Sequence, residues 1–476
     1  MQALRTDLYQ LTMAAGYFHR GMSQAVATCE MFVRRLPRHR RYLVAMGIGR
    51  ALAYLENLRF DAAELDYLAT VPALRDAMTP AFRRFLAELR FTGDVWAVPE
   101  GTVVFEEEPL LRVTAPIVEA QLCETFLLSA VNHATMVASK AARMVVAAGD
   151  AQLMEFGTRR THPEAAIDAA LAACAVGFVG TSNVEAGKRF GLPVLGTAAH
   201  MWTMAHDSEE AAFASYVEVF PNASILLIDT YDTVRGAERA ARVAGDKLKG
   251  VRLDSGDLAA LSRAVRQVLD GAGLRSAKIV ASGDLNEHKI AELRRAGAPI
   301  DIYGIGTELV ASVDAPSLGG VYKLVEITHD GRTTPIAKFS ADKATWPGAH
   351  QVWRHRDASG RYARDVLALA VEFPDEVRWR GFEAPDELRW RGFEVPEGPR
   401  EGDAAAQALL SPMMTRGARI SPPEPLDMVR ARVKRELDAL PVALLSLEDG
   451  PERYPVVPSV RLSALAAEVK EQMVAR

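Results

Sequence analysis

A repeated alternation between residues 151 and 325, in which short apolar runs are separated by amphipathic stretches, constrains the fold more than any other sequence feature. The apolar runs have the length of buried strands, and the stretches between them have the length of helices. This order is typical of parallel sheets with crossover helices. The expected strands are 152–156, 176–179, 194–195, 225–228, 250–253, 278–281 and 300–303. At least six such units predict an α/β barrel, although an open, doubly wound sheet fits the same pattern.

The two flanking regions have a mixed pattern of helices and strands. Residues 1–150 begin with a helical segment at 7–20 and end with a long Ala-rich helix that follows Pro116. Residues 326–476 return to strands before they end in helices at 426–437 and 460–474. The strands expected in the flanks are 28–34, 94–98, 102–106, 110–114, 322–327, 336–339 and 366–373.

Length and composition restrict the class of protein. A chain of 476 residues is long for a single core, so two domains are expected. A net charge of -5 disfavours nonspecific attraction to nucleic acids or membranes. The first residues lack the pattern of a signal peptide, and no apolar run has the length of a membrane span. The widely spaced Cys29, Cys123 and Cys174 predict three small buried side chains in a cytoplasmic protein, not a disulfide framework or a zinc site.

A cluster of polar residues or glycines follows each expected strand of the middle region. Parallel α/β folds bind ligands at the carboxyl ends of their strands, so these clusters are expected to meet at one rim. Together they supply Arg, Asp, Ser, Gly and His, which suit an anionic sugar substrate. The clusters are 155–160, 180–183, 196–200, 229–232, 252–257, 282–284 and 304–308.

Two of these clusters have the form of phosphate-binding turns. Gly283 with Asp284 precedes a helix, and Gly306 with Thr307 follows a strand. Glycine lets backbone N–H groups approach phosphate oxygens, and the start of a helix adds a favourable field. A simple tight turn is the alternative for each of them taken alone.

Charged residues at the end of the fifth expected strand form a second candidate. Arg252 and Asp254 are two positions apart, so they share one face of a strand. Asp254 and Asp257 could hold ribose hydroxyls, or Mg²⁺ together with substrate phosphates. Helix capping explains one of these acids equally well, and a structural ion pair remains an alternative for Arg252.

His200 is the sharpest single candidate for chemistry. It ends the cluster 196–200, and an imidazole titrates near neutral pH and can act as a nucleophile or a proton carrier. His206 is its main rival, while His133 and His162 have weaker positions.

Taken together and in this order, the clusters resemble the nicotinate phosphoribosyltransferase family. The resemblance extends from Thr6 to about Lys323 and rests on the segments 6–13, 155–160, 196–200, 252–257 and 304–307. It implies the type II phosphoribosyltransferase fold, an irregular α/β barrel at 151–325 beside an α+β domain that residues 1–150 begin and parts of 326–476 complete. It also implies a head-to-tail homodimer whose active sites are shared between the subunits.

The resemblance further implies a role for each candidate residue. Tyr9 would reach into the partner's site and stack on a pyridine ring, which Phe156 would face from the other side. Arg159 would hold the nicotinate carboxylate, and Arg252 and Asp254 would hold the ribose and its phosphates. The other substrate-binding positions are Thr158, Asp229, Ser255, Gly283, Asp284, Gly306 and Thr307, of which the last four would line the 5′-phosphate pocket.

The implied reaction joins nicotinate to the phosphoribosyl group of 5-phosphoribosyl 1-diphosphate. The products are nicotinate mononucleotide, a precursor in NAD salvage, and diphosphate. ATP is a co-substrate, because its hydrolysis would be coupled to the transfer through phosphorylated His200. Mg²⁺ would accompany the diphosphate and the ATP, with no metal held by the protein alone. His200, Arg252 and Asp254 are thus the expected catalytic residues.

Several other functions remain open at this stage. A nicotinamide phosphoribosyltransferase has the same fold, but adjacent Arg159 and Arg160 favour a carboxylate substrate. A quinolinate phosphoribosyltransferase and a noncatalytic protein that binds phosphate ligands are further alternatives. A nucleotide-dependent oxidoreductase is disfavoured, because no Gly-x-Gly-x-x-Gly motif follows a strand.

Beyond residue 340 the resemblance is loose. The sequence RWRGFE at 378–383 recurs at 389–394, which predicts a hairpin or a surface insertion. No cysteine follows Cys174, so the cysteine-based zinc site of some family members is not expected.

Overall fold

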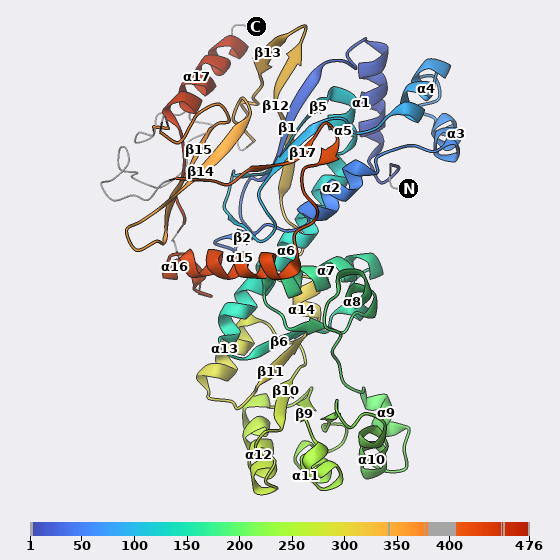
Figure 1. The fold of residues 1–476 in the computed structure, drawn as a ribbon, viewed down its shortest axis with the longest axis vertical. Helices are drawn as coiled ribbons and strands as arrows, with labels where there is room; N and C mark the ends of the chain where they lie inside the picture. The colour runs from blue at the N-terminus through green and yellow to red at the C-terminus, as the bar shows by residue number, and fades with distance from the viewer. Residues whose placement is uncertain are drawn as a thin grey trace. The chain divides into compact units, whose positions relative to one another are not determined.

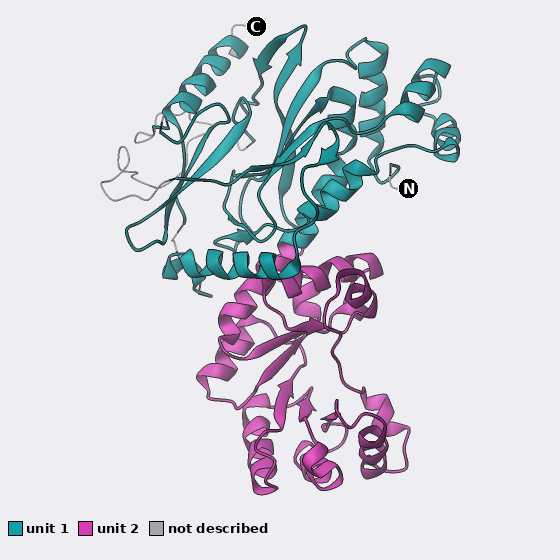
Figure 2. Ribbon diagram, in the orientation of Figure 1, with its two compact units in different colours: residues 1–135, 317–476 teal, residues 136–316 magenta. Residues whose placement is uncertain are grey.

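The computed structural model describes residues 3–340, 343–375, 377–378, 406–448, 450 and 453–474. The chain forms two compact units, shown in different colours in Figure 2. Unit 1 comprises Met1–Thr135 and Ser317–Arg476, and unit 2 comprises Met136–Pro316. Unit 1 is therefore built from both ends of the chain. The division falls inside the long helix α6 (Glu124–Ala148), whereas the sequence pattern places it after this helix.

Six parallel strands organise unit 2 (Figure 1), in the order β7-β6-β11-β10-β9-β8. The last strand of the unit, β11, pairs with the first, β6, in a register that aligns Ile305 with Glu155. Pairing of the last strand with the first is the connectivity of an α/β barrel and not of an open, doubly wound sheet. The strands are β6 (Gln152–Glu155), β7 (Gly180–Thr181), β8 (Ile225–Leu227), β9 (Gly250–Leu253), β10 (Lys278–Ala281) and β11 (Ile302–Ile305).

The ring of strands is open at one place. Val194 makes an isolated parallel bridge to Thr181 of β7, and β8 pairs with β9. Within residues 136–316, all of which are described, no strand pairing joins Val194 to β8. The predicted α/β class is confirmed, with a ring that is incomplete between these two segments.

Helices follow the strands of unit 2, and five of these helices begin at polar capping residues. Asn183, Ser208, Asp232, Asp257 and Asn286 each accept a hydrogen bond from a backbone N–H in the first turn of the helix that follows. The helices are α7 (Pro163–Val176), α8 (Val184–Phe190), α9 (His200–Met204), α10 (Glu209–Val219), α11 (Thr233–Ala244), α12 (Leu258–Gly271), α13 (Glu287–Arg295) and α14 (Thr307–Val310). Asp257 is thus the acid that capping explains.

Two expected strands of the middle region are wrong. Residues 176–179 do not form a strand, because the Ala-rich helix α7 continues through Val176 until Gly177, with φ 137°, ends it. Val194 makes only its single bridge, and the strand expected at 300–303 is displaced to β11.

Unit 1 contains an antiparallel sheet in which both chain ends interleave. Its order is β13-β12-β1-β5-β3-β17-β18, so β1 from the N-terminal segment pairs with β12 from the C-terminal segment. The strands are β1 (Val26–Val33), β3 (Asp94–Ala97), β5 (Pro109–Pro116), β12 (Gly320–His329), β13 (Arg332–Pro335), β17 (Ser411–Thr415) and β18 (Ala418–Arg419). The α+β domain built from N- and C-terminal segments is therefore observed.

Two smaller sheets complete unit 1. One has the order β16-β14-β15-β19, and the other pairs β2 with β4. Their strands are β2 (Leu43–Val44), β4 (Val103–Val104), β14 (His350–Arg356), β15 (Tyr362–Leu369), β16 (Gln407–Ala408) and β19 (Val456–Pro458). The helices are α1 (Leu8–His19), α2 (Ile48–Glu56), α3 (Ala62–Thr70), α4 (Pro80–Glu88), α5 (Ile117–Leu122), α15 (Leu426–Ala439), α16 (Val442–Leu445) and α17 (Val460–Val474).

A hairpin turn corrects another expectation in unit 1. No strand forms at 336–339, because β13 precedes this segment and pairs with β12. Asp330 and Gly331, with φ 50° and 74°, form the turn between them. Positive φ at both central residues is typical of a two-residue hairpin, and this turn fixes the strand register upstream of the expected position.

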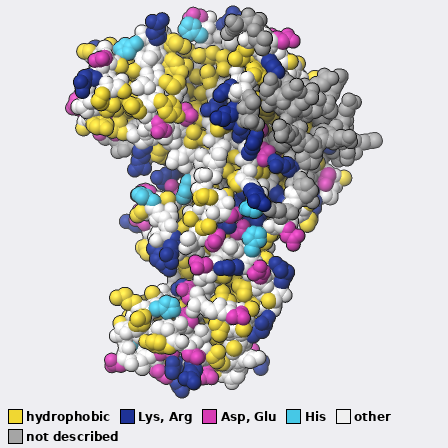
Figure 3. Space-filling view, turned by 180° about the vertical axis from the view of Figure 1, so that it is seen from behind, with side chains coloured by type: hydrophobic (Ala, Val, Ile, Leu, Met, Phe, Trp, Pro, Cys, Tyr) yellow, Lys and Arg dark blue, Asp and Glu magenta, His cyan; other side chains and the backbone are white. Residues whose placement is uncertain are grey.

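The remaining observations concern the cysteines, the surface, the helices and the repeated segment. Cys29, Cys123 and Cys174 have buried side chains, as predicted. Figure 3 shows acidic and basic side chains interspersed on the visible face. Among the described residues, none of the helices combines the length and apolarity needed to cross a bilayer. The repeat at 378–394 lies outside the described residues except for Arg378.

Candidate active site

Arg252, at the carboxyl end of β9, is the centre of a polar cluster in unit 2. Its Nε donates to Ser282 Oγ at 2.8 Å, and Nη1 donates to Thr197 Oγ1 at 2.9 Å. Nη2 donates to Asp254 Oδ1 at 2.6 Å. These partners come from the segment after the bridge at Val194 and from the ends of β9 and β10, so the guanidinium joins loops that are far apart in the sequence.

Asp254 remains ionised in this cluster. Burial alone would raise its pKa, but the hydrogen bond from the Ser282 hydroxyl and the charge of Arg252 lower the pKa below its ordinary value. The expected side-by-side placement of Arg252 and Asp254 is therefore observed, with a stable negative charge beside a fixed positive one.

Asp229, at the end of β8, links this pair to His200. Its Oδ2 accepts hydrogen bonds from the Asp254 backbone N–H at 2.9 Å and from Ser255 Oγ at 2.6 Å. Its Oδ1 is buried without a hydrogen-bond partner and lies 3.9 Å from His200 Nε2. Asp229 thus fixes the loop after β9 and presents one carboxylate oxygen to the imidazole.

His200 begins α9, and its ring is held from two sides. Nδ1 lies 3.1 Å from Thr230 Oγ1, while Nε2 faces Asp229. The side chain remains 40% exposed, so a reactant can reach it. The rival His206 is engaged elsewhere, since its Nδ1 lies 2.8 Å from the Trp202 carbonyl oxygen and its ring packs on Trp202. The contacts favour His200.

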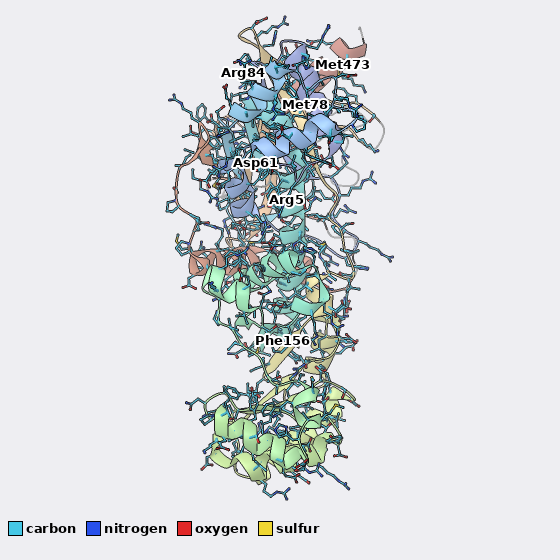
Figure 4. The ribbon with its side chains drawn as sticks, turned by 90° about the vertical axis from the view of Figure 1, so that its right-hand side faces the viewer. Arg5, Asp61, Met78, Arg84, Phe156 and Met473 are labelled. Atoms are coloured by element: carbon cyan, nitrogen blue, oxygen red, sulfur yellow. The ribbon has the colours of Figure 1, made fainter. Side chains whose placement is uncertain are left out.

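Phe156 supplies an aromatic wall and is labelled among the side chains of Figure 4. Its ring centroid lies 5.5 Å from Arg252 Cζ. A Cβ on Gly304 would lie 2.6 Å from the Phe156 ring, and one on Gly306 would lie 3.4 Å from the Phe156 carbonyl oxygen. Glycine at 304 is therefore required for the ring to occupy this position.

The loop after β10 approaches the loop after β9 very closely. Gly283 has φ 96°, and a Cβ there would lie 2.1 Å from the Asp254 carbonyl oxygen. Asp284 adopts φ 47°, which is uncommon for a residue with a side chain. Thr307, after Gly306, begins α14. Both predicted phosphate-binding turns therefore lie at strand ends in the same ring as Arg252.

Three predicted residues stand apart from these contacts. Thr158 and Arg159 lie in a 3₁₀ turn (Thr158–Arg160) directly after β6, with Arg159 exposed and the Thr158 hydroxyl buried without a hydrogen-bond partner. Tyr9 is exposed on α1 in unit 1. Their roles stay predictions.

Four residues that complete the cluster received no individual role from the sequence. Thr197, Thr230 and Ser282 contact Arg252 or His200 through their hydroxyls, and Gly304 makes room for Phe156. All of them lie within the polar clusters at strand ends. Their position in these clusters was the only feature of the sequence that could have pointed to them.

Comparison with known proteins gives consistent matches along the chain. Three protein-family models match this chain. They are the nicotinate phosphoribosyltransferase N-terminal domain at residues 4–132, the nicotinate phosphoribosyltransferase family at 151–366 and the nicotinate phosphoribosyltransferase C-terminal domain at 349–466. A nicotinate phosphoribosyltransferase of Mycobacterium tuberculosis is 42% identical over 97% of this chain and 92% of its own length. One of Bacillus subtilis is 45% identical over 80% of this chain and 79% of its own.

Solved structures give the same result for the fold. The crystal structure of human nicotinic acid phosphoribosyltransferase matches with a TM-score of 0.84 and 30% identity, over 98% of this chain and 99% of that one. A nicotinate-nucleotide pyrophosphorylase from Pyrococcus furiosus matches with a TM-score of 0.70 and 24% identity, over 92% and 95% of the two chains, and supports the fold alone.

Proposed function

The chain belongs to the nicotinate phosphoribosyltransferase family, and from this premise we propose that it forms nicotinate mononucleotide and diphosphate from nicotinate and 5-phosphoribosyl 1-diphosphate in NAD salvage, coupled to ATP hydrolysis through His200. The observation that supports this proposal most strongly is the contact network from Arg252 through Asp254 and Asp229 to His200. It combines a fixed cation, an ionised carboxylate and an accessible imidazole at one set of strand ends.

The network suits a phosphoribosyl donor. The nicotinate ring nitrogen attacks C1 of the ribose, the C1–O bond breaks, and its electron pair leaves with the diphosphate. Positive charge develops on the sugar in this step, and the ionised Asp254 favours it electrostatically. Arg252 and the turns at Gly283 and Gly306 bind negatively charged phosphates, so positioning and charge supply most of the rate enhancement.

The pyridine ring is proposed to bind against Phe156. Arg159, three residues after Phe156, is exposed and can reach a carboxylate, which a planar guanidinium binds well. Tyr9 is proposed to close the partner's site in a homodimer. The exposed Leu8, Tyr9 and Met13 on α1 support this, because such apolar residues gather at interfaces.

ATP coupling is proposed to use His200 as a nucleophile. An imidazole nitrogen attacks the γ-phosphorus of ATP, the bond to ADP breaks, and water later hydrolyses the N–P bond. The buried Asp229 oxygen that faces the ring would stabilise the charged imidazole. Mg²⁺ is treated as part of the diphosphate and ATP substrates.

Incubation of the protein with nicotinate, the donor, Mg²⁺ and γ-labelled ATP tests the proposal. The expected results are nicotinate mononucleotide and an acid-labile phosphoprotein. His200→Ala should lose the label and the ATP coupling while it retains slow, ATP-independent transfer. His206→Ala, the matched control, should keep both activities. A protein that binds the ligands without any turnover would contradict the proposal.

A further inference from the structure

Unit 2 buries a lysine that contacts three carboxylates from three segments. Lys140, on α6, is 2% exposed, and its Nζ lies 2.8 Å from Glu287 Oε2 and 2.8 Å from Asp314 Oδ1. The same nitrogen lies 3.6 Å from Glu308 Oε2. Arg143, one turn further along α6, holds the other oxygen of Glu287 at 2.9 Å. A single ammonium group therefore ties three separate segments to one helix.

The three acids belong to the elements that carry the two proposed phosphate-binding turns. Glu287 is the first residue of α13, which follows Gly283 and Asp284. Glu308 is the second residue of α14, which follows Gly306. Asp314 lies in the turn after α14. Lys140 thus holds the helix beginnings directly behind both turns.

Strained backbone lies close in sequence to the acids that Lys140 contacts. Asp284 has φ 47° and Ser312 has φ 41°, and both are non-glycine residues in the left-handed region. Such conformations persist where the surrounding structure fixes them, and they gather at ligand-binding sites. Ser312 is also fully buried between Glu308 and Asp314. Lys140 contacts Glu308 and Asp314 on either side of Ser312, and it contacts Glu287 three residues after Asp284, whose carbonyl oxygen also accepts a hydrogen bond from Lys289 Nζ at 2.8 Å.

The carboxylate of Glu287 is held in its ionised form by its neighbours. Burial would raise the pKa of Glu287, but Lys140 and Arg143 lower the pKa below its ordinary value, so Glu287 stays ionised. Well-packed apolar residues stabilise a core as well as a buried ion pair does. An ammonium group that contacts Glu287 and Asp314 at 2.8 Å and attracts Glu308 from 3.6 Å, in contrast, restrains the spacing of three carboxylates, which apolar packing specifies less sharply.

We propose that Lys140 is a positioning residue for the transfer reaction, because it fixes the spacing between the Gly283–Asp284 turn and the Gly306–Thr307 turn so that their backbone N–H groups converge on one phosphate group of the donor. This inference rests on the proposed function, since it takes a phosphoribosyl compound as the ligand. Lys140 touches no reactant and acts through Glu287 and Glu308.

Steady-state kinetics of Lys140→Met and Glu308→Gln in the full-length protein test this role, with ribose 5-phosphate as a competitive probe of the phosphate pocket. The KM for the donor and the inhibition constant of ribose 5-phosphate should rise about tenfold in Lys140→Met, because small displacements of binding groups are costly. The KM for nicotinate should change less than about twofold, since its ring site lacks these contacts. Lys140→Arg, which keeps the charge, should recover part of the donor binding.

Glu209→Gln is the matched control. Glu209 is equally buried in unit 2, and it pairs with Arg239 at 2.7 Å between α10 and α11 instead of behind a phosphate turn. This variant should lower the Tm and leave the donor KM unchanged. If Lys140→Met does not fold, Glu308→Gln provides the same kinetic test, because it leaves the Lys140–Glu287 pair in place.

Two outcomes would overturn the inference, and they differ from each other. If the parent protein turns over its substrates while Lys140→Met and Glu308→Gln keep a normal donor KM and lose only Tm, Lys140 is merely structural. If the parent neither turns over the donor nor binds ribose 5-phosphate, the proposed function fails and the inference fails with it.

Discussion

Arginine occupies the centre of one polar cluster in each unit, and the two clusters differ in their access to solvent. In unit 1, Arg354 donates to Asp365 through Nε and Nη2 and to the Val103 carbonyl oxygen through Nη1, and its side chain is 1% exposed. The rings of Tyr362 and Phe105 lie near its guanidinium, with centroids at 4.4 and 5.5 Å.

The arginine of unit 2 has comparable partners in an open setting. Arg252 is 13% exposed, and its partner Asp254 is 31% exposed. Each guanidinium donates hydrogen bonds through Nε, Nη1 and Nη2, so the type of contact does not distinguish the two clusters. The closed cluster of Arg354 therefore holds the fold together, whereas the more open cluster of Arg252 leaves oxygen and nitrogen atoms accessible to a ligand.

The largest expected effect is on the closed cluster. Arg354→Met should lower the free energy of unfolding by about 3–5 kcal/mol, because Asp365 and the nearby Glu108 and Glu436 would lose their buried cation. Urea denaturation followed by circular dichroism measures this change. If Arg354→Met unfolds at the same urea concentration as the parent protein, the cluster does not stabilise the fold.

The second largest effect is expected in the open cluster, where the substitution should impair catalysis more than stability. Arg252→Met should lower kcat/KM for the donor about 100- to 1,000-fold, since a preorganised charge at the reacting phosphates is lost. The free energy of unfolding should fall by less than in Arg354→Met, because the Arg252–Asp254 pair is more exposed to water than the Arg354–Asp365 pair. If Arg252→Met were strongly destabilised but kept normal kinetics, the cluster of unit 2 would be structural like that of unit 1.

A smaller effect tests the substrate end of the open site. Arg159→Ala should raise the KM for nicotinate about tenfold, the cost of losing a hydrogen bond to a charged group. The KM for nicotinamide should remain nearly unchanged. Arg160→Ala serves as the control at the neighbouring exposed position. Faster turnover of nicotinamide than of nicotinate by the parent would instead assign the amide as substrate.

The smallest expected effect concerns pH. Ser282→Ala removes a hydrogen bond that lowers the pKa of Asp254, so that pKa should rise. Asp254 would then take up its proton at higher pH, and the acidic limb of kcat/KM for the donor should move to higher pH. Ser262→Ala is the control, because this buried serine of α12 donates its hydroxyl to the Ala259 carbonyl oxygen within the same helix. If the acidic limb of kcat/KM does not move, the ionisation of Asp254 does not control the rate.

The same pKa direction has a consequence for stability. Because the pKa of Asp254 in the folded protein lies below its ordinary value, the ionised carboxylate stabilises the fold at pH above that ordinary value. This contribution is lost as the pH falls through the folded pKa.

Local patterns predicted the strands of unit 2 where short apolar runs had clear limits. β9 and β10 match the expected 250–253 and 278–281 residue for residue. The prediction failed at 176–179, where alanines continue a helix up to Gly177, and at 336–339, where the turn at Asp330 decides the register. In both cases a single turn or cap residue outweighed apolar content.

The site was predictable to the extent that its residues follow strand ends. The adjacency of Arg252 and Asp254 follows from the two-residue period of a strand. The contact of Arg252 with Thr197, 55 residues away, has no local signature. Lys140 lies in an Ala-rich helix that resembles ordinary core, and only tertiary structure brings it to Glu287 and Glu308.

A crystal structure with nicotinate mononucleotide bound would test the central claim most directly. The open cluster of unit 2 should hold the ligand, with its 5′-phosphate between Gly283 and Gly306, its ribose beside Asp254 and its pyridine ring on Phe156. Nucleotide density away from Arg252, with the strand-end loops of unit 2 empty, would contradict the assignment.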